Sequence, residues 1–288
     1  MTDERKAEAE AGREMTLDEF RATRGGAPVN TSVRQTDPGL TWVGGNRDWE
    51  DLDETSRKNL AATSSGTSIF DPVLCELAYR WFSPAGGLVL DPFAGGSVRG
   101  IVAAKCGRAY VGIDLSAKQI EANREQAETI CRDGLKPVWH CGDSLSVVPS
   151  LDRADFLFSC PPYGDLERYS DDPLDLSTMP RIAFLAAYKA IVAASVARLR
   201  QDRFACFVVG DYRDKKGFYC NFVGETVAAF EAAGARLYNE AILVTAVGSL
   251  PIRITKQFQS SRKLGKTHQN VLVFVKGDPR AATAVCEG

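Results

Sequence analysis

Features that mark several other classes of protein are missing from this sequence of 288 residues. It has only two histidines, and its eight cysteines include no Cys-x-x-Cys pair, which argues against a zinc site or a disulfide framework. We therefore expect no metal, and we expect most cysteines to be buried as small apolar residues. No apolar run approaches the roughly 20 residues that span a bilayer, and no apolar stretch follows the charged N-terminus. These absences predict a cytoplasmic protein without a membrane partner.

Acidic residues are absent from one long stretch near the C-terminus. The formal net charge of -2 argues against a protein that coats nucleic acid nonspecifically, because such binding depends on basic charge. Between Ala241 and Gly277, however, there is no Asp or Glu, while six residues are Lys or Arg. We predict that this stretch contacts DNA phosphates. The candidate residues are Arg253, Lys256, Arg262, Lys263 and Lys266.

The spacing of apolar residues predicts an α/β fold behind a polar tail. From about residue 70 to residue 233, short apolar runs alternate with helical spacings, which predicts five parallel strands with connecting helices. Two further strands, over 236–247 and 270–275, are expected to form an antiparallel edge hairpin joined by a long basic loop rather than a helix. The expected organisation is a flexible tail over 1–35, one domain over 36–280 with recognition loops at about 163–180 and 247–269, and a C-terminal tail over 281–288.

A turn of small residues follows the first predicted strand. The strand ends at Asp91, and Ala94-Gly95-Gly96 then leads into a helix, so that bare backbone lines a crevice at the strand's carboxyl end. Glycine is needed there because a side chain would keep a ligand away from the main chain. No lysine follows the glycines, so the turn is not the phosphate-binding loop of an NTPase.

Acidic residues also end the next two predicted strands. Asp114 follows the glycines by about 20 residues, where a carboxylate can accept hydrogen bonds from both hydroxyls of a ribose. Asp143 can accept a hydrogen bond from the amino group of adenine. Three acidic strand ends suit a ligand with an ammonium group, a ribose and an adenine but no phosphate. The sequence therefore predicts S-adenosylmethionine as the cofactor.

Two motifs stand in a familiar order. Residues 91–97, Asp-Pro-Phe-Ala-Gly-Gly-Ser, match the pattern Asp-Pro-Phe-x-Gly-x-Gly except for Ser97, and residues 160–163, Cys-Pro-Pro-Tyr, match Asn/Asp/Ser-Pro-Pro-Tyr except for Cys160. The sequence thus resembles the N6-adenine and N4-cytosine amino-methyltransferases of DNA, over roughly residues 67–276. Within that family it is most similar to the small modification methylases of phages and prophages. The resemblance implies the Rossmann-like class I methyltransferase fold, with a mostly parallel seven-stranded sheet, and DNA as the partner.

The resemblance also implies roles for individual residues. A segment before the first strand packs on the methionine end of the cofactor in related enzymes, which makes Phe70 and Asp71 candidates, although Asp71 equally suits a helix cap ahead of Pro72. Arg168 and Tyr169, in the acidic loop after Tyr163, are candidates for contact with bases, and a solvated loop is the alternative. The candidate catalytic residues are Cys160, Pro161, Pro162 and Tyr163. The candidate cofactor-binding residues are Phe70, Asp71, Asp91, Pro92, Phe93, Ala94, Gly95, Gly96, Ser97, Asp114, Leu115, Asp143 and Ser144.

The chemistry of amine methylation explains the second motif. The lone pair of an exocyclic base amine is delocalised into the ring, and hydrogen-bond acceptors on its N–H groups help to localise it for attack. Two prolines stiffen the turn so that a carbonyl such as that of Pro161 can accept, while Tyr163 offers a ring on which a flipped base can stack. Methyl transfer then requires in-line geometry.

Cys160 leaves more than one chemistry open because a thiol accepts hydrogen bonds poorly. Its small size, like that of serine, favours cytosine over adenine without excluding adenine. As a thiolate it could instead attack a pyrimidine and direct methylation to cytosine C5, but in the enzymes that do so the cysteine follows the proline. The same motifs would also suit an RNA or protein amine as the acceptor, or an inactive DNA-binding relative. The sequence does not distinguish a monomer from a homodimer.

Overall fold

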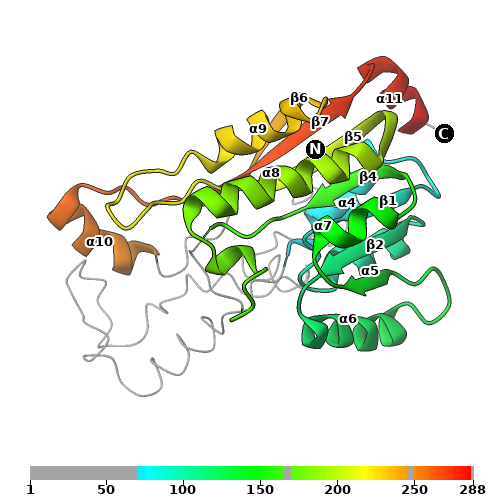
Figure 1. Ribbon diagram of the computed structural model, residues 1–288, viewed down its shortest axis with the longest axis horizontal. Helices are drawn as coiled ribbons and strands as arrows, with labels where there is room; N and C mark the ends of the chain where they lie inside the picture. Colours follow the sequence, from blue (N-terminus) through cyan, green and yellow to red (C-terminus); the bar gives the residue numbers. More distant parts are fainter. Residues whose placement is uncertain (1–69, 165–169, 245–249, 287–288) are drawn as a thin grey trace, which may run out of the picture. The chain divides into compact units, whose positions relative to one another are not determined.

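The computed structural model describes residues 70–164, 170–244 and 250–286, and its core is a seven-stranded sheet of order β3-β2-β1-β4-β5-β7-β6 (Figure 1). Neighbouring pairs among the first five strands are parallel, whereas β7 runs antiparallel to both β5 and β6. This sheet confirms the predicted fold class. The strands are β1 (Leu88–Asp91), β2 (Ala109–Asp114), β3 (Val138–Cys141), β4 (Ala154–Ser159), β5 (Leu199–Val209), β6 (Arg236–Val244) and β7 (His268–Lys276).

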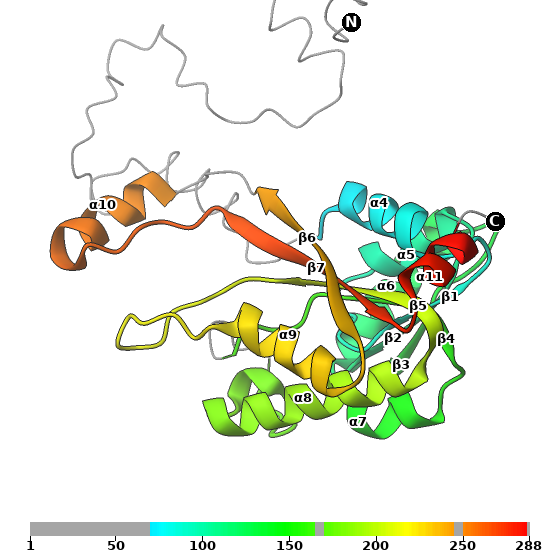
Figure 2. The same ribbon diagram turned by 90° about the horizontal axis from the view of Figure 1, so that it is seen from above.

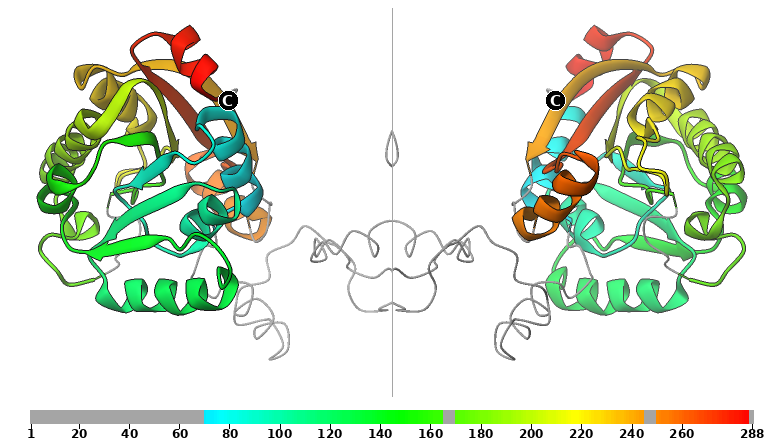
Figure 3. Two further views of the ribbon diagram at one scale, coloured as in Figure 1. Left: turned by 90° about the vertical axis from the view of Figure 1, so that its right-hand side faces the viewer. Right: turned by 90° about the vertical axis from the view of Figure 1, so that its left-hand side faces the viewer.

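Helices cover both faces of the sheet, as the apolar composition of its central strands requires. In β5, Phe204 and Cys206 pack into one core cluster, while Ala205 and Phe207 pack into the other. Figures 2 and 3 show α8 and α9 on one face and α4 and α11 on the other. The helices are α4 (Pro72–Phe82), α5 (Val98–Lys105), α6 (Ala117–Ile130), α7 (Ser144–Val147), α8 (Arg181–Arg198), α9 (Phe222–Ala232), α10 (Leu250–Ser261) and α11 (Pro279–Cys286), with short 3-10 turns at Val148–Ser150 and Leu176–Thr178.

The segment between the last two strands differs from the prediction. A long loop was expected there, but Leu250–Ser261 forms the helix α10. Leu250, Ile254 and Phe258 recur every four residues, which is the helical spacing of an apolar stripe, and Pro251 falls in the first turn, where proline is tolerated. Residues 246–265 belong to a compact unit separate from the one that holds the sheet, so α10 is described by itself.

The C-terminal segment also differs from the prediction. A tail was expected over 281–288, but Pro279–Cys286 forms α11, and Ala282 is buried in the core cluster that contains α4. Asp278 caps this helix by accepting a hydrogen bond from the Ala281 amide at 2.8 Å. In the described part of the chain, no helix is long and apolar enough to cross a membrane, and no group of three or more His, Cys, Asp or Glu residues is placed to hold a metal ion.

Candidate active site

The predicted site residues gather where the parallel strands end. β1, β2 and β4 finish at Asp91, Asp114 and Ser159, and β1 lies between the other two in the sheet. Because the strands are parallel, the loops that follow them share the carboxyl edge, where open α/β sheets bind their ligands. The turn after β1 and the Cys-Pro-Pro-Tyr loop after β4 are therefore neighbours.

Asp91 lies beneath this edge rather than on its surface. Its side chain is fully buried, and its two oxygens accept hydrogen bonds from Arg99 Nε at 2.6 Å, the Tyr110 hydroxyl at 2.8 Å, the Ser159 hydroxyl at 2.5 Å and the Phe93 amide at 3.1 Å. Four donors occupy the carboxylate, so it holds β1, β2 and β4 together. Direct contact between Asp91 and a cofactor, as predicted from the sequence, does not fit this geometry.

Arg99, which the sequence analysis missed, completes the network. It is buried on α5, and its Nη2 donates to the carbonyl oxygens of Phe93 at 2.6 Å and Ala94 at 2.8 Å. Its guanidinium also lies 4.7 Å from the centre of the Phe70 ring. Burial opposes the charge, but Asp91 outweighs it and raises the pKa of Arg99. The signal for Arg99 in the sequence is that it is the one charged residue in the otherwise apolar run 98–104.

The glycine turn is held by side chains and has open space beside its two glycines. Gly95, at φ +50°, donates its N–H to Asp114 Oδ2 at 2.9 Å, and its carbonyl accepts from the buried Asn123 side chain at 2.7 Å. Among the residues that the structure describes, none places an atom within 4 Å of where a Cβ would stand on Gly95 or Gly96. By contrast, Pro92, Ala94 and Ser97 are buried. The space that the sequence predicts for a ligand is therefore open, and it borders backbone.

The neighbouring candidates shape the same edge. Asp114 accepts a second hydrogen bond from the Ser116 amide at 2.8 Å, and burial raises its pKa although both amide bonds lower it. Leu115 lies beside it, half-buried, and its carbonyl accepts from the Cys141 thiol at 3.5 Å. Asp143 caps α7 through the Leu145 amide at 3.1 Å. Ser144, buried, donates to the carbonyl of Pro92 at 2.6 Å, which joins the loop after β3 to the turn after β1.

The segment before α4 supports the turn from the side. Asp71 accepts from the amides of Val73 at 2.8 Å and Leu74 at 3.2 Å, so it is the helix cap that the sequence also allows. Phe70 packs edge-on against Phe158 with ring centres 5.7 Å apart. Phe93 turns inward and stacks on Tyr188 at 6.0 Å.

The Cys-Pro-Pro-Tyr loop is fixed by contacts with distant parts of the chain. The Tyr163 hydroxyl accepts a hydrogen bond from Gln269 Nε2 at 2.5 Å and lies 3.7 Å from Cys160 Sγ. The Tyr163 ring packs edge-on against Phe222 at 6.0 Å. Pro161 is buried and Pro162 half-buried between these anchors. Cys160 is half-buried against the core cluster that also contains Phe158.

Two residues, Lys266 just before β7 and Gln269 near its start, lie close to this loop. A Cβ on Gly210 would stand 3.8 Å from Gln269 Cγ, 3.9 Å from Lys266 Nζ and 4.0 Å from Tyr163 Cε2, so these three side chains surround Gly210. Partial burial lowers the pKa of Lys266, and Asp211 opposes that shift. The sequence predicts phosphate contact for Lys266, and the structure places this lysine beside the Cys-Pro-Pro-Tyr loop. Gln269 was missed, and nothing in its sequence context marks it.

The remaining nucleic-acid candidates are only partly described. Arg168 and Tyr169 lie outside the described residues, and of Arg253 only its place in α10 is described. Lys256 is exposed on α10, whereas Lys263 is half-buried. Arg262 is exposed and lies 5.1 Å from the centre of the Phe258 ring.

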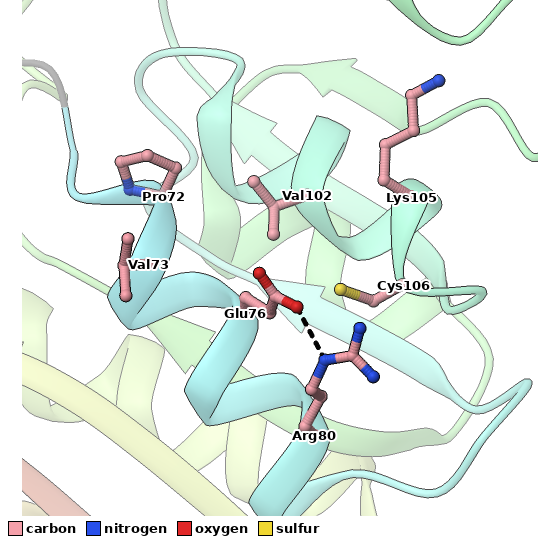
Figure 4. Close-up of a pocket in the computed structure, with 7 residues that line it drawn as sticks. All are labelled: Pro72, Val73, Glu76, Arg80, Val102, Lys105 and Cys106. Atoms are coloured by element: carbon pink, nitrogen blue, oxygen red, sulfur yellow. Dashed lines mark hydrogen bonds and ion pairs between the residues drawn. The ribbon is translucent and has the colours of Figure 1, made fainter. Parts of the chain in front are cut away.

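A surface hollow between α4 and α5 is separate from these candidates (Figure 4). Glu76 and Arg80 point toward each other there and form an ion pair at 2.7 Å. None of the predicted site residues lines the hollow. Its lining consists of Pro72, Val73, Glu76, Arg80, Val102, Lys105 and Cys106.

Comparison with known proteins identifies the fold. No protein-family model and no curated protein matches the sequence. Among solved structures, the cyclase SpnF is 11% identical with a TM-score of 0.51, covering 72% of this chain and 81% of SpnF. The fold is that of class I methyltransferases. At this level of identity the likeness establishes the fold and nothing finer.

Two methyltransferase structures are more distant in shape. TrmN from Thermus thermophilus is 16% identical with a TM-score of 0.49 over 76% of this chain and 52% of TrmN, so this chain spans about half the length of TrmN. The magnesium protoporphyrin IX methyltransferase ChlM from Synechocystis PCC 6803, solved with bound S-adenosylmethionine, is 12% identical with a TM-score of 0.44 over 81% of this chain and 87% of ChlM.

Proposed function

We propose that this chain transfers a methyl group from S-adenosylmethionine to an exocyclic amino group of a DNA base, N4 of cytosine or N6 of adenine. The observation that carries the proposal is the open space over Gly95 and Gly96, bordered by Asp114 and adjacent to the Cys-Pro-Pro-Tyr loop. A class I methyltransferase fold puts a cofactor at that edge of the sheet, and the loop after β4 then faces the transferred group.

The residues present fit the cofactor. The half-buried Asp114 carboxylate keeps lone pairs beyond its two amide bonds and is suited to ribose hydroxyls. Asp143 and Ser144 border the position expected for the adenine, and the bare backbone of Gly95 and Gly96 allows close approach. When bound, S-adenosylmethionine supplies an electrophilic methyl group. The buried ion pair of Asp91 and Arg99 fixes the turn after β1, on which the cofactor would lie.

The acceptor side depends on the loop after β4. The carbonyl of Pro161 accepts a hydrogen bond from the base amine, which localises the nitrogen lone pair, and Tyr163 provides the stacking surface. In the transfer the base nitrogen would form its new bond to the methyl carbon as the carbon–sulfur bond of the sulfonium breaks, the sulfur would leave as a neutral thioether, and the surplus proton on nitrogen would leave to water. Cys160 contributes little as an acceptor, so backbone acceptors carry this role. DNA as the acceptor is supported by the two motifs and by the exposed basic residues Lys256 and Arg262.

Nucleoside mass spectrometry of DNA from cells that express the protein tests this function. We expect N4-methylcytosine or N6-methyladenine with the unaltered protein and neither with Tyr163→Ala, which removes the stacking ring. Finding 5-methylcytosine would instead assign Cys160 the role of nucleophile. The purified enzyme can also be incubated with radioactive cofactor and DNA, RNA or other proteins in turn. Label in RNA or protein but not in DNA would overturn the choice of DNA as the acceptor. Cofactor binding without any methylated product would indicate an inactive relative.

The hydrogen bond between Gln269 and Tyr163 gives a second prediction. We expect Gln269→Leu and Tyr163→Phe each to lower kcat about tenfold, because each removes the bond that orients the ring. The double variant should be no slower than Tyr163→Phe, since that change already removes the whole bond to Gln269 together with the contact between the hydroxyl and Cys160 Sγ. Asn270→Leu is the matched control: the next side chain along β7 points to the other face and bonds Glu240 at 2.7 Å. Additive effects in the double variant would contradict the coupling.

A further inference from the structure

A short hairpin follows β5 at the carboxyl edge of the sheet. Arg213 and Tyr219 form an antiparallel bridge, and the turn between them closes through hydrogen bonds of 2.9 Å from Gly217 N–H to the Asp214 carbonyl and from the Asp214 N–H to the carbonyl of Phe218. In Figures 1 and 2 the segment between β5 and α9 extends beyond the ends of α8 and α9. We call residues 212–220 the β5 hairpin.

The base of the β5 hairpin is anchored beside the catalytic loop. Tyr212 and Cys220 are buried, and the Cys220 amide donates to the Tyr212 carbonyl at 2.9 Å. Tyr212 packs against Phe222, as Tyr163 does. A Cβ on Gly164, the residue after Tyr163, would collide with the Tyr212 hydroxyl. The hairpin therefore begins in contact with the loop to which we assign the acceptor base.

The tip of the β5 hairpin carries exposed aromatic side chains next to basic ones. Phe218 is 72% exposed and Tyr219 is 48% exposed, while Lys215 and Lys216 are also exposed. Against three basic residues the hairpin has one carboxylate, that of the exposed Asp214, whose Oδ1 accepts the Phe218 amide at 2.9 Å. Arg213 lies 3.9 Å from the centre of the Tyr219 ring and bonds the Gly217 carbonyl at 2.9 Å. The surface that the tip offers to a partner is thus positive and aromatic.

Resting on the proposed function, we infer that the β5 hairpin engages duplex DNA, with Lys215 and Lys216 on the phosphates and Phe218 inserted into the base stack beside the flipped base. Exposed lysines with aromatic rings complement a polyanion with stacked bases, whereas lysine is depleted in protein interfaces. A turn already fixed by internal bonds loses little entropy on binding. When a base flips out of the duplex it leaves a gap in the stack. An apolar side chain that fills this gap as a wedge lowers the free-energy cost of unstacking the base.

Binding at several salt concentrations tests the lysines without requiring catalysis. For a fluorescein-labelled duplex of mixed sequence, Lys215→Ala/Lys216→Ala should reduce the slope of log K against log salt by about 2, since each phosphate contact contributes about 0.9. Lys105→Ala is the control, because this exposed lysine ends α5 and leads to the amino end of β2, at the opposite edge. An unchanged slope in the double variant would overturn the assignment of the lysines.

Methylation of duplex and single-stranded DNA tests the wedge. Phe218→Ala should slow methylation of the duplex about tenfold and leave the single strand within about twofold, because a single strand has no stack to open. Trp81→Ala, which removes another exposed aromatic residue near the amino end of β1, should change neither rate. Equal rates for Phe218→Ala and the unaltered protein on the duplex would overturn the wedge alone. Failure of the unaltered protein on both DNAs would overturn the proposed function, and the salt slope would still test the hairpin.

Discussion

Gly96→Val should weaken the binding of S-adenosylmethionine about 100-fold, or about 2.7 kcal/mol, while leaving the protein folded. Gly96 is exposed, does not have a positive φ, and has no atom of another described residue within 4 Å of the position that a Cβ would take. The first side-chain atom of a valine there meets no other described residue, so the fold should tolerate the substitution. It fills the space over the turn that we assign to the cofactor, so the cofactor should be displaced.

Calorimetric titration of the cofactor, with thermal unfolding measured in parallel, tests this result. Gly134→Val is the matched control, since Gly134 is also exposed and no described residue comes within 4 Å of the position of its Cβ, but it lies between α6 and the amino end of β3. The control should bind the cofactor as the unaltered protein does. Undiminished binding by Gly96→Val would show that the cofactor does not lie over this turn.

Arg99→Met should destabilise the protein by about 3–5 kcal/mol, which is a large part of the stability of a typical domain. The Arg99 side chain is 6% exposed and its Nε lies 2.6 Å from the fully buried carboxylate of Asp91. Removing the guanidinium leaves that charge buried with only neutral donors from Phe93, Tyr110 and Ser159. It also removes the donor to the carbonyls of Phe93 and Ala94.

Urea unfolding of a second variant distinguishes the effect of the unpaired Asp91 charge from the effect of lost packing around Arg99. Asp91→Asn/Arg99→Met should recover a large part of the lost free energy, because asparagine carries no charge but its carbonyl still accepts hydrogen bonds. Arg80→Met is the control: its ion pair with Glu76 is exposed to solvent, so we expect no measurable change. An unfolding midpoint for Arg99→Met equal to that of the unaltered protein would show that the pair does not stabilise the fold.

Local patterns in the sequence predicted the fold, and the structure confirms it. Alternation of apolar runs and helical spacings indicated five parallel strands, and the apolar run that ends at Asp91 is β1. The prediction failed at α10, where the basic residues suggested a loop although Leu250, Ile254 and Phe258 have helical spacing. Charge says little about secondary structure, because arginine and lysine are good helix formers.

The sequence by itself determined which loops meet, because parallel strands bring their carboxyl ends to one edge and residues 91–97 and 160–163 each follow such a strand. Only the tertiary structure decided what the side chains do there. Asp91 bonds Ser159 across 68 residues of sequence, and Tyr163 bonds Gln269 across 106. The burial of a side chain and the identity of its hydrogen-bond partners depend on packing between segments that are distant in the sequence. A local sequence pattern does not contain this information. An acidic residue predicted to contact the cofactor therefore proved to be the buried centre that holds three strands together.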